Sequence, residues 1–169
     1  MGTDLCFVVG SSARGGSVGL QDWEEVEAVG GWSILKPIRG DPLPYWIYPR
    51  ELEEAGMQVA KAGGVALAVF VENSDVAYAV ACTDAGVVAR LLFGVEAARD
   101  YTEGREALDL LSDEFSTQPE AFEAWSRLAG TPVSAERIRE MLGQNWLFKE
   151  EAIFKLIKAL GIPVSLERL

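Results

Sequence analysis

The sequence predicts an α+β protein in which an antiparallel sheet precedes a helical C-terminal part. Three observations favour this class. Residues 64–93 contain three β-rich runs that short polar turns separate. Another strand-like run, Leu5–Val9, lies near the N-terminus. From Val95 onward the apolar residues recur at helical spacing instead. Strands that come before helices, without alternating with them, are typical of α+β proteins.

The first forty residues are expected to form two strands with a helix between them. The N-terminal apolar run predicts the first strand, and a glycine- and serine-rich loop follows it at residues 10–19. Residues 21–29 carry four acidic side chains and suggest a short helix, with Asp22 as its N-cap. Gly30-Gly31 would end this helix, and Trp32–Leu35 would be the second strand.

The next segment is irregular and then helical. Residues 36–49 contain four prolines, which exclude a continuous helix and favour an irregular or edge segment. Glu51–Lys61 is predicted to be a helix that Gly63-Gly64 closes.

The three β-rich runs predict an antiparallel meander. They are Val65–Glu72, Val76–Thr83 and Val87–Phe93, and the turns are Asn73–Asp75 and Asp84–Gly86. Bulky and small residues alternate along the first two strands, so each strand has one bulky and one alanine-rich side. The alanine side would admit a helix at close range, and the bulky side would build the main core. Both faces are apolar, so helices or a partner should cover both.

The C-terminal part is expected to be a series of amphipathic helices. Thr117 and Glu120 have the spacing of a capping box, and Ser134 is a candidate N-cap. Gly161 and Pro163 would end the last helix. We therefore divide the chain into a sheet part, residues 1–112, and a helical part, residues 113–169, which either fold separately or pack as one domain. The expected helices are Val95–Tyr101, Arg105–Phe115, Ala121–Leu128, Ala135–Leu142 and Phe148–Leu160.

The composition argues for recognition and against catalysis. The 169 residues include no histidine, the commonest general base and metal ligand. Cys6 and Cys82 lie in apolar runs without a base to activate them. We therefore expect no enzyme, no catalytic residue, no metal and no cofactor; an enzymatic reading would require carboxylate-only or metal-assisted chemistry. The longest apolar run, Val65–Val71, is too short to span a bilayer, and no signal peptide is visible, so a cytoplasmic location is expected.

The loop from Gly10 to Gly19 comes close to a phosphate-binding motif. It lies one residue away from the pattern G-x-x-x-x-G-K-[ST], and the missing residue is the lysine that reaches the phosphates. Arg14 is nearby but at another position. A simple loop therefore fits this segment better than a nucleotide site.

The charge is unevenly distributed and points to a basic protein partner. Acids outnumber bases 26 to 15, and residues 1–130 carry all of the excess, with 21 acids and 9 bases. Such a surface repels phosphate backbones and attracts basic proteins. The candidate partner-binding residues are an acidic group on the predicted helix and an aromatic group near the prolines, which would supply anchors if exposed. They are Glu51, Glu53 and Glu54, and Tyr45, Trp46 and Tyr48.

The C-terminal third resembles a lambda-repressor-like helix-turn-helix domain. The resemblance covers about residues 105–169 and rests on Leu128–Ser134, on Lys155–Ile162, which includes Ala-Leu-Gly, and on Ser165–Leu169. It implies that Ala135–Leu142 is a recognition helix, with DNA contacts from Arg137, Arg139 and Gln144. The long turn, two glutamates on that helix and a net charge of +1 over residues 131–169 depart from the pattern. DNA-binding regulation is thus the alternative function.

The whole chain also resembles small acidic proteins of GC-rich bacteria, some of which are immunity partners of toxins. The resemblance rests on short matches such as Asp4–Phe7, Gly31–Ser33, Asn73–Asp75 and Trp146–Glu151. It implies a bacterial, non-enzymatic inhibitor of a basic, toxin-like protein, and it carries over no functional residue. The sequence leaves the partner and the oligomeric state open.

Overall fold

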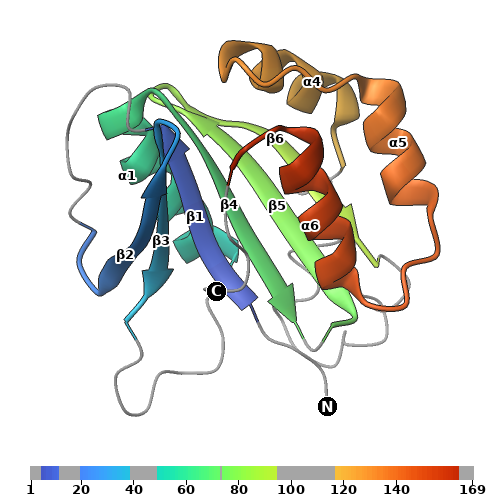
Figure 1. Ribbon diagram of the computed structural model, residues 1–169, viewed down its shortest axis with the longest axis horizontal. Coiled ribbons are helices and arrows are strands. Elements are labelled where there is room, and N and C mark those ends of the chain that lie inside the picture. The colour runs from blue at the N-terminus through green and yellow to red at the C-terminus, as the bar shows by residue number, and fades with distance from the viewer. Residues whose placement is uncertain (1–4, 12–19, 39–48, 73, 95–116, 164–169) are drawn as a thin grey trace.

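The computed structural model describes residues 5–11, 20–38, 49–72, 74–94 and 117–163 (Figure 1). Within them lies one six-stranded sheet with the order β2-β3-β1-β4-β5-β6, in which all neighbouring strands are antiparallel. The α+β class and the meander are confirmed, and the predicted N-terminal strand is central in the sheet. The strands are β1 (Leu5–Ser11), β2 (Trp23–Val29), β3 (Trp32–Pro37), β4 (Val65–Glu72), β5 (Val76–Thr83) and β6 (Gly86–Phe93).

Helices cover both faces of the sheet. One face carries α1, and the other carries α4, α5 and α6 (Figure 1). Four of the predicted helices are confirmed in this way, whereas those at Val95–Tyr101 and Arg105–Phe115 lie outside the described residues. None of the described helices is long and apolar enough to cross a membrane. Their bounds are α1 (Pro49–Gly63), α4 (Pro119–Leu128), α5 (Ala135–Gly143) and α6 (Lys149–Ala159).

The acidic helix predicted over residues 21–29 is wrong, because this segment is the edge strand β2. It forms a hairpin with β3 through Gly30 and Gly31, whose φ angles are 58° and 80°. Positive φ at both turn positions defines the two-residue turn that best matches strand twist. Asp22 has a φ of 65° and lies in the turn just before the strand, so it caps no helix. The acidic side chains suggest a helix, but the segment forms a strand because it pairs with β3 and because Val26 packs against the core.

The strand register places large side chains beside small ones on both faces of the sheet. Leu67 of β4 faces Ala81 of β5, and the next pair on the other face is Ala68 with Val80. The expectation of one alanine-rich and one bulky face is therefore wrong for the sheet as a whole, although it holds for each strand. Because large side chains of one strand lie beside small ones of the next, both faces of the sheet have a similar bulk, and helices pack on both.

Helix α1 lies close to the sheet because small residues occur at the contact. A Cβ added at Gly56 would approach Cys82 Sγ to 3.0 Å and Ala68 Cβ to 3.1 Å. On the strand side, a Cβ at Gly10 would collide with Val59. The expected approach of a helix at alanine positions is thus seen at Ala68.

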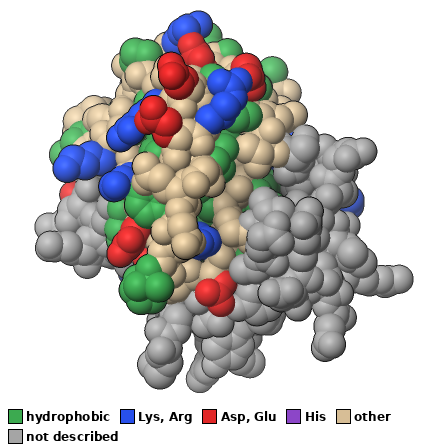
Figure 2. All heavy atoms as spheres, turned by 90° about the vertical axis from the view of Figure 1, so that its right-hand side faces the viewer, with side chains coloured by type: hydrophobic (Ala, Val, Ile, Leu, Met, Phe, Trp, Pro, Cys, Tyr) green, Lys and Arg blue, Asp and Glu red, His purple; other side chains and the backbone are tan. Residues whose placement is uncertain are grey.

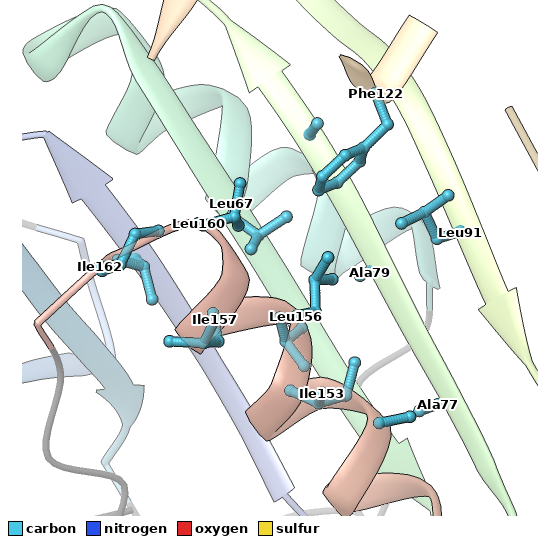
Figure 3. Packing of buried hydrophobic residues seen from close by; sticks show 14 of the residues in the cluster. Leu67, Ala77, Ala79, Leu91, Phe122, Ile153, Leu156, Ile157, Leu160 and Ile162 are labelled. Carbon is cyan, nitrogen blue, oxygen red and sulfur yellow. The ribbon is translucent and has the colours of Figure 1, made fainter. Parts of the chain in front are cut away.

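The opposite face forms the larger core, which the sheet shares with the helical part (Figure 3). The predicted apolar stripe of α6 is confirmed and packs across β4 and β5. Trp125 of α4 donates its indole N–H to the Cys82 carbonyl oxygen at 3.0 Å, which ties α4 to the sheet. Each fully buried aliphatic side chain stabilises the fold by about 1.5–3 kcal/mol. The side chains meeting here include Leu67, Ala77, Ala79, Leu91, Phe122, Ile153, Leu156, Ile157, Leu160 and Ile162.

One predicted helix cap is confirmed and another is wrong. Ser134 Oγ accepts the Arg137 N–H at 3.2 Å, as expected for the N-cap of α5. The capping box of Thr117 and Glu120 does not form, because the N-cap of α4 is Gln118 and its side chain makes no capping bond. Thr117 Oγ1 instead accepts the Leu92 N–H at 3.2 Å, so this residue satisfies a backbone donor of the edge strand β6.

Candidate functional site

A buried ionic cluster joins α1 to the sheet and includes one of the predicted partner-binding residues. Glu53 accepts hydrogen bonds from Arg90 Nε at 2.8 Å and from Arg90 Nη2 at 3.2 Å. The Tyr78 hydroxyl donates to Glu53 Oε1 at 2.6 Å. Only 10% of the Glu53 side chain and 15% of the Arg90 side chain are exposed. Glu53 therefore faces inward, which corrects its expected place on a solvent-facing acidic surface.

The cluster shifts the pKa values of its neighbours in directions that disfavour chemistry. Burial, and then the hydrogen bond to Glu53, raise the pKa of the Tyr78 hydroxyl. The hydrogen bond to Glu53 raises the pKa of Arg90. Burial raises the pKa of the Cys82 thiol to about 12, with a contribution from the Glu53 charge. Burial also raises the pKa of Cys6 to about 12. Neither thiol ionises near neutral pH, so neither is an activated nucleophile.

The exposed face of α1 is not strongly acidic. Glu51 and Glu54 are exposed as expected, but Arg50 and Lys61 are also exposed on this helix. The expected acidic group is thus reduced to two carboxylates with two cations on the same helix. The aromatic group Tyr45, Trp46 and Tyr48 lies outside the described residues.

The acidic side chains gather more densely on β2, at the edge of the sheet. Glu24 and Glu25 are exposed, Glu27 is half-buried, and Asp22 is exposed in the turn just before the strand. Glu24 lies 3.6 Å from Lys36 Nζ of β3, a contact between partly exposed groups that contributes little to stability. We call β2 and β3, with their Gly30-Gly31 turn, the acidic hairpin. It is the most acidic element that the structure describes.

The arginines expected to face DNA are paired with carboxylates. Arg137 Nη1 donates to Glu140 Oε2 at 2.7 Å, and Arg139 pairs with Glu120 of α4. Two positions apart on a helix lie on nearly opposite sides, so the two arginines do not share one face. Gln144 is exposed and is the C-cap of α5. Figure 2 shows acidic and basic side chains intermixed on this side of the molecule.

Charge therefore separates by layer. The described residues between 5 and 94 include ten acidic and four basic side chains. The described residues from 117 to 163 include six of each. Among these described residues, the sheet with α1 carries an excess of negative charge, and the helices on the other face carry a balanced set.

Among the described residues, neither the glycine-rich loop nor a set of metal ligands provides a further site. Gly10 and Ser11, at the start of the glycine-rich loop, belong to β1. The rest of this loop, residues 12–19, lies outside the described residues. Within the part of the chain that the structure describes, no group of three or more acidic, cysteine or histidine side chains lies close enough to hold a metal ion.

Sequence reasoning missed the two main features of this region. Arg90 is the one charged residue in the apolar run of β6, and this isolation is a signal that it has a buried partner. The Gly-Gly pair between two runs that include Val29 and Trp32 is likewise a hairpin signal.

Comparison with known proteins finds no matching family model, no similar curated protein and no similar solved structure.

Proposed function

We propose that this protein is a non-enzymatic binding module that recognises a basic partner protein through its acidic hairpin. The observation that carries the proposal is the exposure of Glu24 and Glu25 on the edge strand β2, with Asp22 exposed in the turn before it. Carboxylates in this arrangement attract a cationic surface, accelerate association and repel acidic competitors. An inhibitor of a toxin-like enzyme, as in immunity proteins, is the specific form of this function that we favour.

The rigid support of the hairpin favours binding over chemistry. Trp32 and Ile34 of β3 are buried in the main core, while Leu35 is buried on the other face. The hairpin is therefore held by both layers, and its acidic side chains project from a fixed frame. A preorganised surface loses little conformational entropy when it binds.

The test compares two charge reversals of equal size. The doubly substituted variant Glu24→Lys/Glu25→Lys changes the hairpin, and Glu136→Lys/Glu151→Lys makes the same change of charge on exposed positions of α5 and α6. Each tagged protein is used to capture proteins from a lysate of its native cell. We expect the hairpin variant to lose a basic protein that the wild type and the helix variant both retain. Equal capture by all three proteins would show that the hairpin is not the binding surface.

The same experiment separates protein binding from DNA binding. Nuclease treatment should leave the captured protein in place, and Arg137→Ala/Arg139→Ala should not alter capture. Capture of DNA that falls steeply with salt and disappears in this arginine variant would favour the regulator instead.

A further inference from the structure

We draw no further inference here: the strongest candidate, the Glu150 carboxylate at the N-terminus of α6, accepts the Ser74 hydroxyl at 3.0 Å through Oε1 and leaves Oε2 buried without a hydrogen-bond partner, but Glu150 as a whole is only partly buried, and among the described residues no second observation at this helix N-terminus points to a ligand.

Discussion

At the scale of single residues, the ionic cluster of Glu53, Arg90 and Tyr78 shows most clearly how burial changes the role of a side chain. Glu53 was expected on the surface, but it is a structural residue inside the fold. Glu51 and Glu54 lie on the same helix and are exposed, whereas Glu53 points into the sheet. A carboxylate with so little exposure requires a cation and hydrogen-bond donors, and Arg90 and Tyr78 supply them. The cluster connects α1, β5 and β6 and so specifies where α1 lies.

Removing the Glu53 charge should therefore destabilise the protein much more than removing a neighbouring charge. Glu53→Gln removes the carboxylate charge beside the largely buried Arg90 guanidinium, and breaking such a pair costs about 3 kcal/mol or more. Glu54→Gln, on the exposed side of the same helix, should change stability by less than about 0.5 kcal/mol. Urea unfolding of both variants measures the difference. Similar values for the two would show that the cluster contributes no more than surface charge.

The thiols of Cys82, which is buried, and of Cys6, which is partly buried, predict a loss of stability at alkaline pH. The pKa of each cysteine is raised from an ordinary 9.0 to about 12 in the folded protein. Their contribution is therefore fully present below pH 9 and is lost as pH rises from 9 toward 12, because the unfolded thiols ionise first. The raised pKa of Tyr78 acts in the same direction.

Urea midpoints measured on either side of this pH range test the prediction. Cys6→Ala/Cys82→Ala should show a shallower fall with pH than the wild type, whatever its stability at neutral pH. A fall of equal steepness in both proteins would assign the alkaline effect to other groups.

At the scale of elements, the acidic hairpin shows why local composition was insufficient. Residues 21–29 have the charges of a helix N-terminus, yet they form a strand, because β3 offers backbone partners and Val26 packs on the main core. The turn residues carried the better signal. Gly30 and Gly31 adopt positive φ angles, which other residues rarely do.

The turn should be sensitive to substitution even where space is available. A Cβ at Gly31 would meet nothing within 4 Å, so Gly31→Ala adds no clash, but the φ of 80° is strained for alanine. We expect a destabilisation of about 1 kcal/mol. Gly143→Ala is the matched control, because its surroundings are also open and it lies in α5, where alanine is favoured by up to about 1 kcal/mol. Denaturant unfolding should give opposite signs for the two variants, and a neutral Gly31→Ala would contradict the strained turn.

At the scale of the whole molecule, the sheet and the helical layer share one hydrophobic cluster. Residues of β1, β3, β4, β5 and β6 contact residues of α4, α5 and α6 within it. Trp125 adds a hydrogen bond from α4 to β5. The two parts into which the sequence was divided thus meet over an apolar surface whose exposure would be costly, so we expect them to unfold together.

Leu156→Ala tests this cooperativity. Leu156 of α6 is fully buried in the shared cluster, and its truncation should cost about 2–5 kcal/mol. Circular dichroism and tryptophan fluorescence should report the same shifted midpoint, because α6 and the sheet lose their contacts together. Lys158→Ala, at an exposed position of the same helix, serves as the control and should leave the midpoint nearly unchanged. Two separate transitions would show that the helical part is an independent unit.

The sequence alone determined the elements whose signals are local and periodic. The meander, the first strand, α1 and the stripe of α6 follow from apolar alternation or helical spacing, and Ser134 follows from the chemistry of an N-cap. Apolar alternation, helical spacing and N-cap chemistry each involve residues that are close together in the sequence. They can therefore be recognised without knowing which distant residues lie nearby in the fold.

Only the tertiary structure decided what depends on contacts between distant segments. Pairing with β3 makes the acidic segment a strand, β2. The fold also pairs Glu53 with Arg90, which lies 37 residues further along the chain, and places Arg139 beside Glu120. Whether a charged side chain is a binding group or a structural one depends on its burial and its counter-ion, and the fold determines both.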